Sequence, residues 1–376
     1  MSNNNVTTAT ATRANPPSPD TEVPHTIADE TGDVLAADVI TDDASSESGA
    51  SLASSTTSVT SSILEYRLEN GRTYHKYKDG SSTGHLMMRE KMIGLLTEAI
   101  APEKDLVHNL YLRTFDDRLG TAPPNDSHSK VGRVLDVGTG SGIWANDFGD
   151  EHPEADVIGI DLSASQPSFT PPNVRFEIDD IEEPWTFSQP FDYIHSRMMK
   201  GSIRDWQTYL KRCFDNLNPG GYLELNDVDG FPTSDDGTLT EDCNLMKAFR
   251  LCFEALAALG SPFEEFSRFE SIMTEIGFED VHIRRFKWPT NSWPKDQRHK
   301  ELGIWNHENL APHLDGLLMA PLTRALNWTS EEVSLLAMEA RKDLANRSIH
   351  AYFNIWSIHG RKPLKTRESQ DDTSYE

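Results

Sequence analysis

The stretch VGRVLDVGTGSG at residues 131–142 constrains the fold of this chain more than any other. Its apolar residues Val134, Leu135 and Val137 predict a short buried strand, which three alternating glycines follow directly. Residues 143–150 then predict the start of a helix. Strand, glycine turn and helix in this order are typical of a nucleotide-binding α/β unit, because a Cβ in the turn would block either the ligand or the tight backbone path.

The spacing of the glycines and the acid before them favour one class of ligand. Gly138, Gly140 and Gly142 form the pattern G-x-G-x-G, whereas dinucleotide-binding domains carry G-x-G-x-x-G. Asp136 lies inside the end of the strand, where its carboxylate would repel a pyrophosphate and attract an ammonium group. The methionyl end of S-adenosylmethionine carries such a group, so we expect this cofactor rather than NAD or FAD.

Two further strands end in acids that suit the same cofactor. Residues 155–163 predict a strand ending at Asp161, whose carboxylate would accept hydrogen bonds from both ribose hydroxyls. Residues 173–185 predict a strand followed by Asp180 and Ile181. Asp180 would accept a hydrogen bond from the adenine amino group, while Ile181 would pack on the adenine ring.

The alternation of strands and helices continues, which predicts a doubly wound parallel sheet with ligands above the carboxyl ends of its strands. We expect the last two strands to form a hairpin edge that closes a seven-stranded sheet, and the helices between them to cover the substrate side. The predicted elements are a strand at 191–199, a helix at 206–217 ended by NPGG at 218–221, a strand at 222–228, helices at 241–260 and 262–278, a strand at 279–289, helices within 296–345 (the last beginning at a Ser330 cap), and a strand at 351–360.

Several segments resemble the class I S-adenosylmethionine-dependent methyltransferases and, more narrowly, the fungal LaeA-type methyltransferases, which act with velvet proteins. The resemblance runs from about Tyr66 to Lys365. The glycine loop is general to the superfamily, whereas ENGRTYHKYKDG at 69–80 and IHAYFNIWSIHGRKPL at 349–364 are much narrower. The resemblance implies a Rossmann-like α/β fold with a seven-stranded, mostly parallel sheet and helices on both of its faces.

The resemblance also implies a function. It indicates a methyltransferase that uses S-adenosyl-L-methionine and regulates fungal secondary metabolism and development. It would act in the nucleus and cytoplasm, in a complex with velvet-type regulators or a second methyltransferase subunit. Two alternatives stay open, namely a small-molecule O- or N-methyltransferase of a secondary-metabolite pathway, and a cofactor-binding scaffold with little transferase activity.

Carried over by position, the resemblance assigns the cofactor site and one candidate catalytic residue. His195 and Arg197, just past the fourth strand, would face the transferred methyl group. Methyl transfer rests mostly on positioning and desolvation, and a general base helps when the acceptor is a hydroxyl or an ammonium. Besides His195, the acids Glu224 and Asp227 are candidate bases near the strand ends. The alternatives are that His195 only caps the strand end or lines the cofactor pocket, and that the two acids are crevice acids or solvated. The predicted cofactor-binding residues are Asp136, Gly138, Gly140, Asp161, Asp180 and Ile181.

The composition excludes several other functions. The formal net charge is −25, from 35 Lys and Arg against 60 Asp and Glu, which argues against direct binding to nucleic acid or to anionic lipid. No apolar run reaches the roughly 18 residues of a membrane span, so we expect at most peripheral tethering through a partner. The three cysteines lack the spacing of a zinc site, and no metal is expected.

The composition of residues 1–62 differs from that of the rest of the chain. Residues 1–62 hold nine Asp and Glu, one Arg, and 22 Ser and Thr, a composition that predicts a disordered tail. The further predicted regions are an N-terminal helical flap at 63–130, the S-adenosylmethionine-binding core at 131–230, a helical cover with closing strands at 231–366, and a short frayed tail at 367–376.

Overall fold

The structure of the chain is a computed structural model. The residues that the structure describes are 28–29, 34–38, 66–69, 72–75, 106–260 and 264–364. The predicted frayed tail at 367–376 lies outside them, and so does most of the predicted flap before residue 106.

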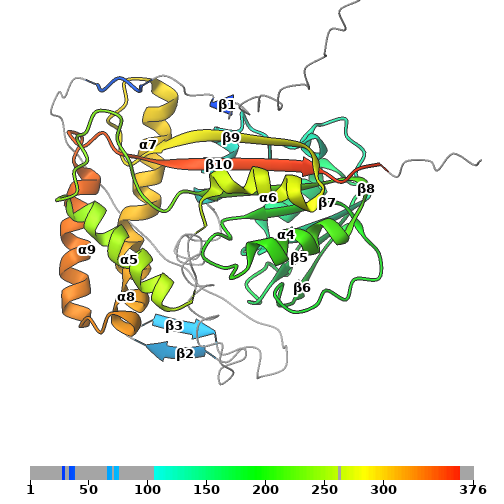
Figure 1. Ribbon diagram of the computed structural model, residues 1–376, viewed down its shortest axis with the longest axis horizontal. Coiled ribbons are helices and arrows are strands. Elements are labelled where there is room, and N and C mark those ends of the chain that lie inside the picture. Colours follow the sequence, from blue (N-terminus) through cyan, green and yellow to red (C-terminus); the bar gives the residue numbers. More distant parts are fainter. Residues whose placement is uncertain are drawn as a thin grey trace, which may run out of the picture.

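One large sheet organises the described residues (Figure 1). Its strands are β1 (Ala28–Asp29), β4 (Arg133–Val137), β5 (Asp156–Asp161), β6 (Val174–Ile178), β7 (Phe191–Arg197), β8 (Leu217–Val228), β9 (Glu279–Pro289) and β10 (Tyr352–Arg361). They lie in the order β1-β9-β10-β8-β7-β4-β5-β6. The strands from β8 to β6 are parallel, and β10 runs antiparallel to both β8 and β9. The predicted seven-stranded sheet and its hairpin edge are thus confirmed, with the two-residue β1 added beside β9.

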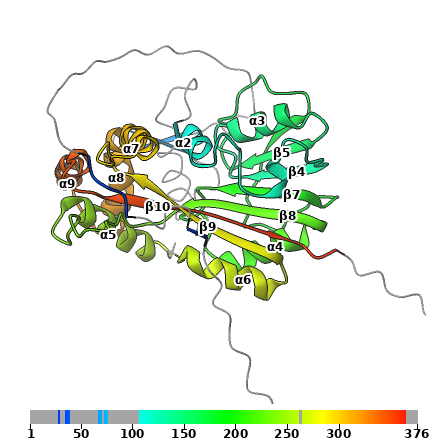
Figure 2. The same ribbon diagram turned by 90° about the horizontal axis from the view of Figure 1, so that it is seen from above.

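Helices cover both faces of the sheet, as the alternation of its strands requires. Figure 2 shows α3 (Ile143–Glu151) on one face and α4 (Trp206–Asp215) with α6 (Phe269–Ile276) on the other. Because successive side chains in a strand point to opposite faces, Val134 packs with the α3 side of the core while Leu135 packs with the α4 side. Asp136 lies two residues after Val134, so its side chain also points toward α3.

A second group of helices forms the predicted cover at one end of the sheet (Figure 1). They are α5 (Asn244–Ala258), α7 (Gln297–Leu310), α8 (Leu314–Ala325) and α9 (Ser330–Ala345). Buried leucines and alanines of α5, α8 and α9 share one core, to which Phe353 of β10 contributes. A separate helix, α2 (Leu106–Thr114), packs against α7 and the sheet, and a hairpin of β2 (Tyr66–Glu69) and β3 (Arg72–His75) stands apart from the sheet.

Two predicted boundaries are wrong for identifiable reasons. NPGG lies within β8 instead of ending a helix, because α4 already ends at Asp215. Gly220 has a φ of 84° and the pairing with β7 shifts register there, which is the irregularity that glycine permits in a strand. The N-cap of α9 is Thr329 instead of Ser330, since Thr329 and Glu332 form a reciprocal capping box.

The predicted disordered tail at residues 1–62 contains a segment that packs against the rest of the protein. Residues 34–38 pack on the cover, where the Asp38 N–H donates to the Trp293 carbonyl oxygen at 2.9 Å. The Asp38 carboxylate also forms an ion pair with Lys300 of α7. Apart from β1 and this segment, residues 1–62 lie outside the described part of the chain. Within the described part, no helix has the length and apolar character needed to cross a bilayer.

Candidate active site

The three loop glycines meet different surroundings. All three have positive φ, at 69° for Gly138, 56° for Gly140 and 79° for Gly142, a region that residues with a Cβ rarely adopt. A Cβ on Gly138 would lie 2.3 Å from the sulfur of Met199, and one on Gly142 would lie 2.5 Å from the ring of Phe176. A Cβ on Gly140 would meet no atom within 4 Å. Packing therefore demands the outer glycines, whereas Gly140 faces open space that a ligand can fill.

Asp161 holds that open glycine in place. One of its carboxylate oxygens accepts the Gly140 N–H at 2.8 Å, and the other accepts the backbone N–H and the hydroxyl of Ser163 at 3.0 and 2.8 Å. The Gly140 carbonyl in turn accepts from the side chain of Gln166 at 2.7 Å. The structure thus brings together the glycine and the acid that the sequence predicts for the cofactor, although 21 residues separate them.

The turn after β6 carries the other two predicted cofactor residues to the same edge. The N–H of Asp179 donates to the Asp161 carbonyl at 3.1 Å, so the turn begins beside Asp161. Asp180 is buried, and its carboxylate accepts the N–H of Glu182 at 3.0 Å. Ile181 is buried in the core on the α4 side. Gly140, Asp161 and the 180–181 turn thus lie along one edge of the sheet.

Asp136 lies beneath the glycine loop. It is 2 % exposed, and one carboxylate oxygen accepts the hydroxyl of Thr139 at 2.6 Å. The other shares a 2.7 Å hydrogen bond with Nδ1 of His195. Because both oxygens are engaged inside the protein, the structure assigns Asp136 to holding the loop. Its direct contact with the methionyl ammonium stays a prediction.

The predicted position of His195 is corrected by the structure. β7 runs from Phe191 to Arg197, so His195 lies inside the strand, as the predicted strand at 191–199 has it, and not just past it. Its side chain is fully buried, with the ring stacked on Trp144 at a centroid distance of 3.7 Å and Nε2 at 3.4 Å from the side-chain nitrogen of Asn226. A catalytic base must touch the acceptor, whereas both ring nitrogens of His195 face protein groups. His195 is therefore a positioning residue for Asp136.

Arg197 ends β7 and reaches toward α2, and its place facing the transferred methyl group stays a prediction. Its guanidinium lies 5.2 Å from the ring centre of Tyr111, and one of its nitrogens lies 3.3 Å from Nδ1 of His108. His108 is buried and shares a 2.9 Å hydrogen bond with Asp147 of α3. Arg197 thus ties α2 to the end of β7.

Glu224, a candidate base in the sequence, is a buried carboxylate surrounded by protein donors. It accepts the N–H groups of Thr121 and Ala122 at 2.6 and 3.0 Å and the hydroxyl of Tyr193 at 2.7 Å. Burial alone would raise the pKa of Glu224, but nearby His359 and these hydrogen bonds hold it below its usual value. The ionised group therefore fastens the loop before β4 to the sheet.

Four titratable residues stand in register across this face of the sheet. Asp136 of β4 pairs with His195 of β7, His195 pairs with Glu224 of β8, and Glu224 pairs with His359 of β10. Acids and histidines alternate along this row, which we call the buried row.

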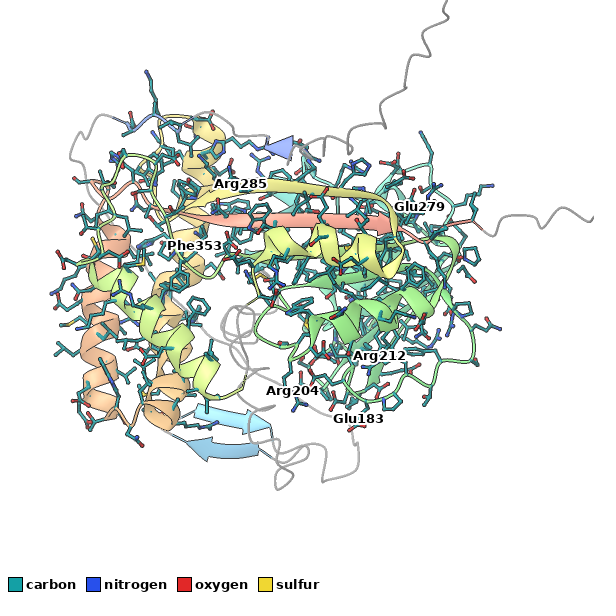
Figure 3. The ribbon with its side chains drawn as sticks, in the orientation of Figure 1. Glu183, Arg204, Arg212, Glu279, Arg285 and Phe353 are labelled. Carbon is teal, nitrogen blue, oxygen red and sulfur yellow. The ribbon has the colours of Figure 1, made fainter. Side chains whose placement is uncertain are left out.

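Asp227 differs from the other two candidate bases because it lines a cavity. Its carboxylate oxygens accept the N–H groups of Lys200 and Val228 at 2.7 and 2.8 Å, and burial raises its pKa to about 6. The cavity measures about 80 Å³ and lies between the ends of β7 and β8 and the helices α5, α7 and α8. We call it the cover cavity; its wall includes Met198, Lys200, Asp227, Phe249, Asn309 and Phe353. Figure 3 labels Phe353 near the start of β10, beside the cover helices.

The sequence interpretation missed two sets of residues in this wall. Lys200 is buried and its Nζ lies 3.3 Å from a carboxylate oxygen of Asp229. Burial lowers the pKa of Lys200, against the opposing effect of Asp229 and Asp227. Lys200 follows the end of a predicted strand, a position that could have signalled it. Asn306 and Asn309 come from α7, about a hundred residues later, and no spacing in the sequence relates them to the strand ends.

Comparison with known proteins agrees with this geometry. A model of the methyltransferase domain matches residues 106–283. The methyltransferase pytC of Aspergillus terreus is 38% identical over 311 residues, which are 82% of this chain and 92% of that protein. The chain belongs to the methyltransferase family. The secondary metabolism regulator LAE1 of Cochliobolus heterostrophus is 34% identical over 304 residues (79% and 94%), and the probable methyltransferase tdiE of Emericella nidulans is 32% identical over 258 residues (69% and 80%).

This methyltransferase uses S-adenosylmethionine, which supplies a methyl group already activated on a sulfonium sulfur. The residues present fit the cofactor, because Gly140 faces open space and Asp161 lies against it with lone pairs to spare. Asp180 and Ile181 follow on the neighbouring strand, as the predicted adenine contacts require. Among the described residues, no group of three or more His, Cys, Asp or Glu side chains could hold a metal ion.

Proposed function

We propose that this methyltransferase transfers the methyl group to a small molecule with a largely apolar body, bound in the cover cavity. The observation that carries the proposal is the cavity itself. Aromatic and aliphatic side chains dominate its wall, among them Phe249, Trp288 and Leu317, and only a few polar groups interrupt them. This is the usual composition of a small-molecule site.

The backbone after β7 links the cover cavity to the cofactor loop. Met198 has a φ of 56°, a left-handed conformation rare for a residue with a side chain, and its N–H donates to the Asn226 carbonyl at 2.9 Å. Such conformations cluster at functional sites. Met198 lines the cavity. The side chain of the next residue, Met199, packs against Gly138 of the glycine loop. Consecutive residues therefore line the cavity and contact the glycine loop, which supports an acceptor site next to the cofactor.

The named relatives support methyl transfer, the reaction on which this proposal rests. Methyltransferase pytC and the probable methyltransferase tdiE are both named for the transfer reaction, and the chain covers 92% and 80% of their lengths. In the proposed reaction, the cavity wall orients the acceptor and excludes water, which is most of what methyl transfer from a sulfonium requires.

The test is the fate of a tritium-labelled methyl group. The full chain, labelled S-adenosylmethionine and a fungal culture extract are incubated together, and proteins are then separated from small molecules. We expect label in the small-molecule fraction, and at least a tenfold loss of it when Leu317→Trp fills the cavity. The same change at Leu335, which is 59% exposed on α9, is the matched control. Label confined to protein would contradict the proposal.

A second candidate is regulation of secondary metabolism and development with velvet-type partners, in the nucleus and cytoplasm. It is supported by the 34% identity to the regulator LAE1 and by the LaeA-type segments at 69–80 and 349–364. The net charge of −25 favours action through protein partners over direct nucleic-acid binding. Label on a reconstituted velvet-type partner, with the small-molecule fraction unlabelled, would support this role. Cofactor binding without label in either fraction would indicate a scaffold.

A further inference from the structure

The polar groups in the wall of the cover cavity are unbalanced in charge. Two carboxylates, Asp227 and Asp229, face one lysine, Lys200. The ammonium of Lys200 forms its ion pair with Asp229, at 3.3 Å. Within the described residues, the hydrogen bonds of the Asp227 carboxylate come from backbone N–H groups, at 2.7 and 2.8 Å. With two carboxylates and one ammonium, the wall carries one negative charge that Lys200 does not compensate.

A second group in the same wall also needs a hydrogen-bond donor. Asn309 is 3 % exposed, and its side-chain oxygen is buried without a hydrogen-bond partner among the described residues. Its neighbour on α7, Asn306, differs because its side-chain nitrogen donates to the Pro289 carbonyl at 3.0 Å. A buried acceptor without a partner is costly in a protein interior. Asn309 thus indicates a ligand that donates.

The other charged groups near Asp227 do not supply that donor. The hydroxyl of Tyr111 lies close enough for Asp227 to contribute to the raised pKa of Tyr111, but it donates to the sulfur of Met198 at 3.3 Å. Arg197 lies over the ring of Tyr111 and contacts His108. Tyr111 and Arg197 are therefore both engaged elsewhere.

We propose that the acceptor is an amine, whose protonated nitrogen lies on Asp227 and Asn309 and whose apolar body packs on Phe249 and Trp288. This inference rests on the proposed small-molecule function. A primary ammonium has three donors and a positive charge, so it satisfies both acceptors and compensates the buried carboxylate. An alcohol of the same shape has one donor and no charge.

Methylation of an amine in this cavity requires a base for the ammonium proton and a methyl donor, which Asp227 and S-adenosylmethionine would supply. An N–H bond of the ammonium breaks and its proton passes to the Asp227 carboxylate. The freed nitrogen lone pair forms a bond to the methyl carbon, while the carbon–sulfur bond of the cofactor breaks and its electron pair stays on sulfur. The products are an N-methylammonium and S-adenosylhomocysteine, and Asp227 releases its proton to water. Asp227 is then a catalytic residue that both binds and deprotonates the acceptor.

The test compares amines with alcohols of the same body. Tryptamine against tryptophol, and 3-phenylpropylamine against 3-phenylpropan-1-ol, are titrated by calorimetry into the full chain saturated with S-adenosylhomocysteine. We expect each amine to bind at least tenfold more tightly than its alcohol. We also expect transfer of labelled methyl from S-adenosylmethionine to the amines.

Two variants and a control assign the preference to the cavity wall. Asp227→Asn should abolish the amine preference, and Asn309→Leu should reduce it severalfold, while both variants still bind S-adenosylhomocysteine. The control is Asp235→Asn, which removes a carboxylate outside the cavity that pairs with the buried Lys287 at 2.8 Å. It should leave the preference unchanged.

The outcomes separate this inference from the function on which it rests. Alcohols that bind as tightly as the amines, or an amine preference that survives in Asp227→Asn, would overturn the amine assignment while leaving a small-molecule acceptor in place. Failure of every probe to bind, together with label on protein alone, would overturn the small-molecule function and the inference with it.

Discussion

The predicted cofactor edge of the sheet, formed by Asp136, Gly140, Asp161 and the turn at 180–181, and the cover cavity use their acids in opposite ways. At the cofactor edge, Asp136 and Asp161 accept hydrogen bonds that fix the glycine loop. In the cavity, Asp227 is left with backbone donors and a pKa raised to about 6. The acids of the edge are thus committed to the loop that is predicted to hold the cofactor, whereas Asp227 accepts hydrogen bonds only from backbone N–H groups among the described residues.

The same contrast occurs within β8, where Glu224 and Asp227 lie three residues apart. An odd separation in a strand places two side chains on opposite faces. Glu224 points toward α3, where its hydrogen bonds and nearby histidines lower its pKa despite burial. Asp227 points into the cover cavity, where burial raises its pKa. β8 therefore carries one carboxylate that holds the structure together, Glu224, and one that can interact with a ligand in the cover cavity, Asp227.

The largest expected effect concerns the structural carboxylate. Glu224→Ala leaves the donors of Thr121, Ala122 and Tyr193 unsatisfied, so the free energy of unfolding should fall by about 3–5 kcal/mol. Urea denaturation measures it. Tyr193→Phe, which removes a single donor, should cost about 1 kcal/mol. Equal losses in the two variants would contradict the role given to Glu224.

The second effect separates the two acids by pH. The folded-state pKa of Asp227, about 6, lies above the ordinary 3.8. The protonated form therefore favours the folded state, and that stability is full below about pH 4 and is lost as the pH rises through about 6. Relative to the wild type, Asp227→Asn should gain about 3 kcal/mol in unfolding free energy between about pH 4 and pH 7. Parallel stability curves for the two proteins would show that Asp227 is not perturbed.

The third effect tests the cofactor edge. Asp161→Ala should weaken S-adenosylhomocysteine binding tenfold or more, because hydrogen bonds to two ribose hydroxyls and the support of Gly140 are lost together. Calorimetric titration measures the affinity. Asp156→Ala, at the opposite end of β5, is the matched control and should bind normally. Unchanged affinity in Asp161→Ala would mean that the ribose lies elsewhere.

The smallest effect concerns the segment at 34–38. Asp38→Ala removes partly exposed ion pairs with Lys300 and Arg347, so it should lower the free energy of unfolding by about 0.5–1 kcal/mol. Thermal unfolding measures the loss, with Asp150→Ala on the exposed side of α3 as the control. A loss no greater than that of the control would show that this segment contributes nothing to stability.

The cofactor edge could be predicted because its residues are close in sequence and follow strand ends. Apolar runs and glycines located β4, β5 and β6, and the acid after each run identified Asp161 and Asp180. The errors arose from register. Whether His195 lies inside or beyond β7 depends on where the strand ends, and the alignment of His195 with Glu224 follows from pairing between strands that no single-strand pattern contains.

The cover cavity could not be predicted for a different reason. Its wall combines residues from β7, β8, α5, α7, α8 and β10, which are brought together by the packing of the cover. Asn309 looks like any polar residue of an amphipathic helix until the packing of α7 buries it. Asp227 was a candidate in sequence, but only the geometry separates it from Glu224.

The buried row has a mechanical consequence for the enzyme. Asp136 at one end supports Thr139 in the glycine loop, and His359 at the other end belongs to the closing hairpin. Thr121 bridges its last two members, with its hydroxyl 3.2 Å from Nδ1 of His359 and its N–H on Glu224. Strand pairing and these hydrogen bonds therefore connect the hairpin, the loop before β4 and the glycine loop, and we expect the three to move as one unit. We therefore expect damage to β10 to disturb the glycine loop after β4, although the two strands lie three positions apart in the sheet.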